Sequence, residues 1–349
     1  MHLGRNAFTI GSLRAPTSPA LRLKTQRALR AVWAFPLAVM ALAVVGAVAT
    51  EGLRGESVDP EYGARITLLR TQLASNPDRP LFLVVGSSRV VAGFAPETLP
   101  SLSTLDGRPI LPFNLARMGA GPVTNYLTLT RLFRDNIRPV WVLIELMPGI
   151  LAGEDSAAVA RRCAARDLPV AHPYVPVDKL YPEYLRERTV HLAGVVQRAW
   201  NPADPATQYG PLGGYLGLRD RFDTAERDRL VAEQAVCYGP LLRAFAVPPD
   251  ADRAVRDSVR LCHDHGARVG LLMMPEGIDF RRLYGPGCEQ RFVEYVVGVG
   301  QELEVPVIDA RDWLAEDELA DSHHALRQGA AKFTSRLIRE VLGPTATGW

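Results

Sequence analysis

The chain has 349 residues and a formal net charge of +2, with 40 Lys and Arg against 38 Asp and Glu. This length suits one large α/β domain, or a domain with a sizeable insertion. The balanced charge does not provide the basic field with which proteins bind nucleic acid. With only 7% aromatic residues, the chain also offers no base-stacking surface, so we expect no nucleic-acid partner.

The amino-terminal region predicts a membrane anchor. Residues 31–50 carry no charge and are mostly apolar, and about 20 such residues suffice for a helix to cross a bilayer. Residues 1–30 contain Arg and Lys but no acidic residue, which predicts a cytoplasmic amino terminus and an exported remainder. A cleaved signal peptide is the closest alternative, because Ala47-Val48-Ala49 resembles a cleavage site. A buried core helix is a further alternative.

Residues 51–78 are polar and predict a helical linker, followed by a domain over residues 79–349. Five runs in that domain are predominantly apolar rather than alternating, which is typical of parallel strands buried on both faces. The predicted strands are Leu81–Val85, Ile110–Leu115, Val140–Leu146, Val269–Met274 and Val305–Ile308.

Helical patterns alternate with these runs. Their apolar faces are Tyr126, Leu129, Leu132 and Phe133; Val255, Val259 and Cys262; Phe292, Val296 and Val299; and Phe333, Leu337 and Val341. The alternation predicts an α/β fold: a three-layer α/β/α sandwich with a flavodoxin-like parallel five-stranded sheet. Residues 151–250 break the pattern and are too long for a plain loop. They predict a mostly helical insertion that acts as a lid or specificity element, with a merely decorative insertion as the alternative.

A serine follows the first predicted strand directly, in the segment Gly86-Ser87-Ser88-Arg89. Glycine permits a tight turn there. A serine at the start of the next helix lies beside free backbone amides that favour a developing anion. Serine is also a common helix cap, so the segment alone favours a plain turn.

Polar residues also end the next two strands. Asn114 begins a turn that includes Gly119, whose unhindered N–H can stabilise an oxyanion, although Asn and Gly also suit an ordinary turn. Glu145 lies in an apolar strand and requires a partner if it is buried. A structural ion pair is the preferred interpretation of Glu145. The candidate partners are Arg89, Arg117 and Arg161.

The segment Asp321-Ser322-His323-His324 precedes the last helical pattern. One short turn can place Asp321 beside His324, where the carboxylate would fix the imidazole tautomer and stabilise its charged form. His323 is the alternative base, and a pair of surface histidines without a catalytic role is the simpler interpretation. Ser88, His324 and Asp321 together would supply a nucleophile, a base and a group that orients the base.

The four cysteines contain no Cys-x-x-Cys pair, which gives no support for a zinc or thiol-redox site. They are Cys163, Cys237, Cys262 and Cys288. An exported domain can hold one or two disulfides, but the spacing does not select a pairing. A nucleotide-binding Gly-x-Gly-x-x-Gly segment after a strand is also absent from the sequence. We therefore expect no metal and no organic cofactor.

In this order, the blocks resemble the SGNH/GDSL hydrolase superfamily over residues 80–150 and 252–343. The first block is similar to the family's Gly-Asp-Ser-x, with Ser87 in place of Asp, which implies that Ser88 is the nucleophile. Gly119 matches the oxyanion glycine of the second block. Asp321 and His324 match the final Asp-x-x-His.

Within the superfamily, the chain looks most similar to membrane-anchored proteins that acylate cell-envelope polymers. Relatives of alginate O-acetylation and lipoteichoic-acid D-alanylation proteins belong to this group. The Gly-Ser-Ser-Arg block and residues 329–334 carry the likeness.

The third block departs from the family, because Met147-Pro148-Gly149 stands where an oxyanion asparagine is usual. The resemblance then implies an oxyanion hole built from the amides of Ser88 and Gly119, helped by Gly149. Losing one donor typically costs about 2.7–4 kcal/mol of transition-state stabilisation. The residues expected to support the site are Ser87, Arg89, Asn114 and Glu145.

The resemblance implies a serine-dependent acyl-ester hydrolase or O-acyltransferase acting outside the cytoplasmic membrane. Its substrate would be a small acyl group, such as acetyl, on a surface polysaccharide. Expected partners are the membrane, that polysaccharide and other envelope-assembly proteins. A non-catalytic SGNH-like envelope assembly protein is the alternative, and the missing asparagine favours it.

Overall fold

The structure is a computed structural model that describes residues 58–99, 109–190 and 207–342, together with positions 30, 32–39, 41–42 and 45–46. Within these residues, no helix is both long enough and apolar enough to cross a membrane. The predicted cytoplasmic segment lies almost entirely outside the described residues, and the predicted span 31–50 lies partly outside them. The anchor therefore stays a prediction.

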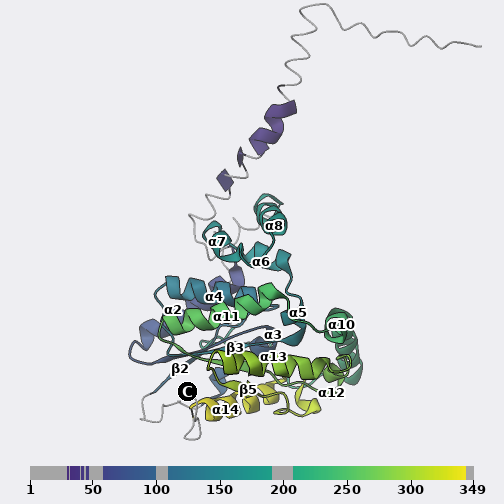
Figure 1. Cartoon of the computed structure of the whole chain (residues 1–349). Helices are drawn as coiled ribbons and strands as arrows, with labels where there is room; N and C mark the ends of the chain where they lie inside the picture. Colours follow the sequence, from purple (N-terminus) through teal and green to yellow (C-terminus); the bar gives the residue numbers. More distant parts are fainter. Residues whose placement is uncertain are drawn as a thin grey trace, which may run out of the picture.

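Five parallel strands form one sheet in the order β2-β1-β3-β4-β5 (Figure 1). The strands are β1 (Leu81–Val85), β2 (Leu111–Asn114), β3 (Trp141–Glu145), β4 (Arg268–Met273) and β5 (Val307–Asp309). Each coincides with a predicted strand to within two residues at either end. Every residue of β1, β2 and β3 is buried, as expected for parallel strands with helices on both faces.

Alternate residues of each strand enter two separate hydrophobic cores. Leu83 and Val85 of β1 pack with α2, α4, α11 and α13 on one face, whereas Phe82 and Val84 pack with α3 and α14 on the other. These helices are α2 (Pro60–Ser75), α3 (Ser88–Gly93), α4 (Pro122–Arg134), α11 (Pro249–Asp264), α13 (Cys288–Glu302) and α14 (Arg327–Leu342). The α/β class and the parallel sheet are as predicted, and helices on both faces are consistent with the predicted three layers.

Helix α2 lies in the segment that the sequence predicts to be a linker, but it is packed into the domain. Tyr62, Ile66 and Leu69 are buried in the core on one face of the sheet. The buried Arg65 donates hydrogen bonds from Nη1 to the carbonyl oxygens of Asn114 and Gly213, each at 2.8 Å. The polar composition of the segment concealed this narrow apolar face, so the packed domain includes residues well before 79.

The described part of the predicted insertion, residues 151–250, is mainly helical. Helices α6 (Ser156–Arg162), α7 (Leu168–Ala171) and α8 (Val177–Val190) share a small core with Val123 and Leu127 of α4. Helix α10 (Thr224–Arg243) instead lies against α5 (Pro148–Ala152) and α12 (Ile278–Arg281). The insertion therefore divides into one part over α4 and another beside the ends of β3 and β4.

Three of the four cysteines form no disulfide in this structure. Cys262 and Cys288 are buried with free thiols, and Cys237 is exposed with a free thiol. Burial raises the pKa of the Cys262 thiol well above its usual value. The Cys163 thiol donates to the carbonyl oxygen of Val159 at 3.3 Å. The disulfides considered from the sequence therefore do not involve Cys237, Cys262 or Cys288 in this structure.

A buried charge network joins α2, α4 and the insertion. Asp59, which caps α2, accepts hydrogen bonds from Arg117 and from Arg131, the latter at 2.8 Å. Arg131 also pairs with Asp167 at 2.8 Å. Burial alone would raise the pKa of Asp59, but the two guanidinium groups outweigh it and lower the pKa to about 2. One carboxylate therefore holds two buried cations.

We expect Asp59→Asn to lower the free energy of unfolding by about 3–5 kcal/mol, because the buried Arg117 loses its carboxylate partner and the buried Arg131 keeps only Asp167. Asparagine keeps the capping function, so the change tests the charge. Since the pKa of Asp59 is lowered to about 2, its contribution is present above about pH 4 and is lost as the pH falls towards 2. The measurement is urea denaturation at neutral and at acidic pH.

The matched control is Glu233→Gln, which breaks an exposed pair with Arg229 on α10. The side chains of Arg229 and Glu233 are 61% and 52% exposed, so this variant should lose less than about 1 kcal/mol of the free energy of unfolding. Equal losses in the two variants would contradict a structural role for the buried network.

Candidate active site

Ser88 is the first residue of α3 and follows β1 after a two-residue turn. Strand β1 lies between β2 and β3, where the order of strands along the chain reverses. Ligands of open α/β sheets bind at the carboxyl ends of strands at such a point. Ser87 caps α3, because its Oγ accepts a hydrogen bond from the Arg89 amide at 3.2 Å. The local fold thus places the Ser88 hydroxyl at the usual ligand-binding edge.

Ser88, His324 and Asp321 form a continuous hydrogen-bonded row. Nε2 of His324 lies 2.8 Å from Oγ of Ser88, and Nδ1 lies 2.8 Å from Oδ2 of Asp321. The three side chains are 236 and 3 residues apart in sequence, so the fold brings the two ends of the domain together. The row has the geometry of a nucleophile, a base and a group that orients the base.

A tight loop holds Asp321 and His324 side by side. Ser322 has a φ of 68°, which turns the chain sharply between them. The amide of Ala320 donates to the carbonyl oxygen of His324 at 2.7 Å and closes the loop. Ser322 is buried, and its Oγ accepts from the amide of Phe280 at 3.0 Å. The Asp-x-x-His spacing therefore brings the two side chains together through one left-handed residue, Ser322, which α12 holds by the hydrogen bond from Phe280.

The Asp321 carboxylate is strongly stabilised in its charged form. Its Oδ1 accepts from the His324 amide at 2.9 Å, and its Oδ2 also accepts from Gln234 at 3.3 Å. Burial alone would raise the pKa of Asp321, but the hydrogen bonds from the ring and the amide of His324 outweigh it and hold the pKa well below its usual range. Asp321 is therefore ionised over the whole physiological pH range and can stabilise a protonated His324.

His323, the alternative base, packs into the protein instead. Its ring stacks on Phe280 with centroids 4.7 Å apart, and it meets Tyr238 edge-on at 5.8 Å. Nδ1 lies 3.3 Å from the carbonyl oxygen of Asp321, whereas the buried Nε2 has no hydrogen-bond partner. Burial and the adjacent His324 lower the pKa of His323 well below its usual value, so this ring is neutral. His324 is the histidine that contacts Ser88.

Glu145, at the end of β3, fixes the turn before Ser88. Its Oε2 accepts from the Ser87 amide at 2.6 Å. A Cβ on Gly86 would lie 2.5 Å from that oxygen and 2.7 Å from Cγ2 of Val90, so only glycine fits the turn without a shift. Burial raises the pKa of Glu145, although the nearby Arg89 and the Ser87 amide partly offset it.

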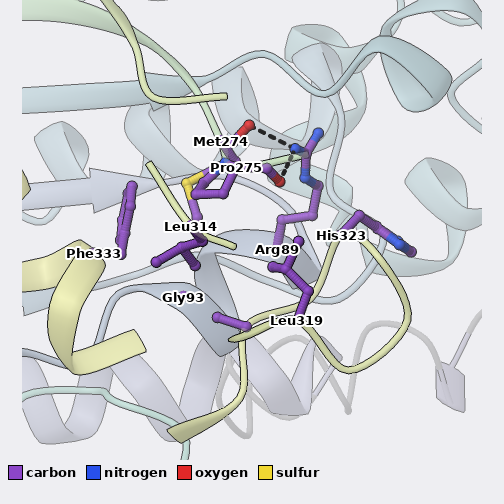
Figure 2. Close-up of a pocket in the computed structure, with 9 residues that line it drawn as sticks. Arg89, Gly93, Met274, Pro275, Leu314, Leu319, His323 and Phe333 are labelled. Carbon is purple, nitrogen blue, oxygen red and sulfur yellow. Dashed lines mark hydrogen bonds between the residues drawn. The ribbon is translucent and has the colours of Figure 1, made fainter. Parts of the chain in front are cut away.

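Arg89 ties the same turn to the end of β4, as Figure 2 shows. Its Nη2 donates to the carbonyl oxygens of Met274 and Pro275, each at 2.8 Å. Its other contacts are ionic, at 3.3 Å to Glu276 and 3.9 Å to Glu145. Of the three partners considered for Glu145, Arg89 is the one in contact, since Arg117 pairs with Asp59 and Arg161 pairs with Asp155.

Asn114 and the two predicted oxyanion glycines differ in their positions. Asn114 is buried and donates to the carbonyl oxygens of Val90 and Phe94, so it ties β2 to α3. Gly119 is exposed with a φ of 62°, and the preceding residue, Met118, lines a cavity beside Ser88. Gly149 is buried in α5, where a Cβ would lie 2.6 Å from the ring of Tyr238. Neither glycine is among the described residues that line the cavity around Ser88.

Sequence reasoning missed Glu276, Gln234 and Tyr238. Glu276 follows β4 in the segment Met274-Pro275-Glu276-Gly277, just as Met147-Pro148-Gly149 follows β3. An acidic residue at the end of a predicted strand was the signal that could have identified Glu276. Gln234 and Tyr238 lie one turn apart on α10, in the insertion. Their contacts with Asp321 and His323 depend on how the insertion folds back, which no local pattern reveals.

A cavity of about 600 Å³ opens beside the row of Ser88, His324 and Asp321. Ser88, Asp321 and His324 form part of its wall, and most of the rest is apolar. The insertion supplies a large share of that wall, from residues 208–222 and from α10. The volume is within the range of ordinary small-molecule sites, which is about 300–1,000 Å³.

Asp321, His323 and His324 are also the described residues that come closest to a metal-binding group. Their ligand atoms all lie within 4.8 Å of one another. Both ring nitrogens of His324 already contact Asp321 and Ser88, and Nδ1 of His323 faces a carbonyl oxygen. A metal ion on His324 would have to displace the contact of this ring either with Ser88 or with Asp321, so the residues fit a serine–histidine–aspartate row better than a metal centre.

Comparison with known proteins does not supply a family for this site. No family model matches the chain, and no curated protein matches it significantly. Function has to be argued from the geometry and chemistry of the site itself.

We expect Gly86→Ala to destabilise the domain by about 1–3 kcal/mol, the usual cost of overpacking, because the new Cβ overlaps Glu145 and Val90. Denaturant unfolding measures the loss. Gly298→Ala on α13 is the control, since a Cβ there meets nothing within 4 Å. Alanine should raise the stability of that helix by about 0.5–1 kcal/mol. A stable Gly86→Ala variant would show that the turn can move.

Proposed function

We propose that the chain is a serine-dependent acyl-ester hydrolase or O-acyltransferase of the SGNH type. The supporting observation is the row in which His324 contacts Ser88 Oγ at 2.8 Å through one nitrogen and Asp321 at 2.8 Å through the other. The strand order and the position of Ser88 after β1 also agree with the proposed flavodoxin-like sandwich.

In the proposed reaction, Ser88 Oγ attacks the ester carbonyl while Nε2 of His324 takes its proton. Asp321 stabilises the imidazolium that forms. When the ester C–O bond breaks, His324 gives the proton to the leaving alcohol, and the acyl group stays on Ser88. Water or an acceptor hydroxyl then attacks this acyl-enzyme with His324 again as base, which releases the acid or the new ester and restores Ser88.

The oxyanion donors in this proposal are the amides of Ser88 and Gly119. Gly119 suits the role because it is exposed, and its neighbour Met118 lines the cavity. Gly149 is a weaker candidate than the sequence predicts, since Tyr238 covers it. The absent asparagine would leave the reaction slower than in enzymes with a full set of donors.

A second candidate function is a non-catalytic envelope assembly protein that kept the fold. The segment Met147-Pro148-Gly149 favours it, because it supplies no asparagine donor. The ionised Asp321 and the short contact between His324 and Ser88 favour the enzyme. We therefore place catalysis first.

The proposed location is outside the cytoplasmic membrane, behind an amino-terminal anchor. In the described part of residues 32–45, large apolar side chains are 50–73% exposed, including Trp33 at 68% and Phe35 at 73%. Apolar side chains exposed in this way favour contact with lipid or another apolar surface. The proposed substrate is an acyl ester of that compartment, with a surface polysaccharide as the acceptor or carrier.

Ser88→Ala should abolish covalent labelling by a fluorophosphonate probe while the fold persists. Ser87→Ala should reduce labelling without removing it, because it removes only the cap of α3. Losing such a cap costs about 1 kcal/mol of stability, so both variants should unfold close to the wild-type denaturant concentration. Labelling that survives in Ser88→Ala, or a folded wild type that never labels, would move the assignment to the assembly protein.

A reporter fused after residue 60 tests the location. The basic segment 1–30 before the uncharged stretch 31–50 predicts activity only from a reporter that works in the exported compartment. Fusions to an exported-type and a cytoplasmic-type reporter should therefore give opposite results. Activity of the cytoplasmic-type reporter would refute the proposed location.

A further inference from the structure

The wall of the active-site cavity is apolar on every element that builds it. Helix α3 contributes Val91 and Ala92 next to Ser88, and α10 contributes Leu230. Met118, which follows β2, is also part of the wall, and the insertion segment before α10 and the catalytic loop, which carries Asp321 and His324, add the remaining apolar residues. Those apolar residues are Tyr209, Tyr215, Leu218, Phe222, Ala320, Ala325 and Leu326.

Apart from Ser88, Asp321 and His324, the polar groups of this wall are the side chains of Gln208, Arg219 and Gln234 and the hydroxyls of Tyr209 and Tyr215. Gln234 donates to Asp321 at 3.3 Å. Arg219 pairs with Glu226 at 2.7 Å, and its guanidinium lies 4.7 Å from the centroid of the Phe222 ring. A sugar ring would require many hydrogen bonds from its surroundings, and this wall offers few groups to make them.

The apolar wall is also fixed in position. The Glu97 carboxylate accepts from the amides of Leu212 and Gly214, each at 2.9 Å, and so holds the insertion segment against the domain. Helix α10 is tied down by Arg227, which pairs with Asp279 at 3.0 Å and with Glu316. The cavity is therefore a preformed apolar chamber beside the nucleophile rather than a gap between loose segments.

The volume is far larger than an acetyl group needs. A volume of about 600 Å³ is typical of sites that hold drug-sized molecules, whereas an acetyl group has only two carbon atoms. An acetyl group would leave most of the apolar wall in contact with water. Met118 and Tyr215 illustrate the surface left uncovered, at 54% and 39% exposed.

We propose that this cavity binds the apolar chain of the acyl group, and that the site prefers acyl chains of about eight carbons over acetyl. The proposal rests on the proposed function and replaces the small acyl group that the resemblance implies with a longer, apolar one. The carbonyl carbon lies at Ser88 Oγ, and the chain extends between α3, α10 and the catalytic loop. The alcohol or acceptor part of the ester then approaches from the open side.

The test is the hydrolysis of a series of p-nitrophenyl esters by the full chain, from acetyl through butanoyl to octanoyl. Burying one methylene contributes about fourfold in transition-state affinity, so kcat/KM should rise along the series and differ at least tenfold between acetyl and octanoyl. Fluorophosphonates with short and long alkyl chains provide an independent measurement, and the long-chain probe should label Ser88 at least tenfold faster.

The matched variants are Leu230→Trp and Val236→Trp on the same helix. Leu230 lines the cavity, whereas Val236 is 77% exposed and does not. The larger ring at position 230 should lower kcat/KM for the octanoyl ester at least tenfold and affect the acetyl ester far less. Val236→Trp should leave kcat/KM unchanged for both esters.

The outcomes separate the two proposals. Equal or faster reaction with acetyl than with octanoyl groups, while Ser88 still labels, overturns the acyl-chain preference and leaves the proposed enzyme intact. Loss of both ester reactions in Leu230→Trp would also count against the preference if that variant keeps its folded denaturation profile. Absence of labelling with either probe, in folded protein, overturns the proposed function itself.

Discussion

The geometry of the site depends on the contacts that the buried guanidinium of Arg89 makes. It joins the start of α3 to the main chain after β4, and it lies between the carboxyl groups of Glu145 and Glu276. Burial raises the pKa of Glu276, which Arg89 and Arg311 partly offset, so these acids depend on a cation nearby. Removing that cation would leave buried carboxyl groups without compensation, a costly change in any protein interior.

These contacts fix the position of the turn that carries Ser88. Glu145 holds the Ser87 amide from the end of β3 while Arg89 holds the carbonyl groups after β4, so the turn is fixed from two strand ends. The packing of a parallel sheet gathers these ends at one edge. A nucleophile needs its oxygen held within a few tenths of an ångström of the productive position, and rigid strand ends meet that demand better than loops.

The insertion covers part of the edge of the sheet around Ser88 and His324. Tyr238 of α10 covers Gly149 and meets His323, and Gln234 reaches Asp321. The same helix and the preceding segment form the apolar wall beside Ser88. The Asp321 side chain is 5% exposed, and burial of this kind strengthens its interaction with His324, because the effective dielectric constant is lower than in water. One segment therefore contacts the Asp321–His324 loop and also forms much of the cavity wall.

Sequence by itself determined the parts of this protein that follow from local periodicity. The five predominantly apolar runs predicted a parallel sheet because strands covered on both faces have no polar side, and the spacing of Asp321 and His324 allowed them to share one turn. Tertiary structure alone decided the role of α2, whose narrow apolar face looked like a linker, and the partner of Glu145, for which three arginines were candidates. It also decided that His323 packs on Phe280, that Gly149 lies under Tyr238 and that the cavity is apolar and large. These features arise between residues far apart in the chain, and no local pattern encodes which distant surfaces meet.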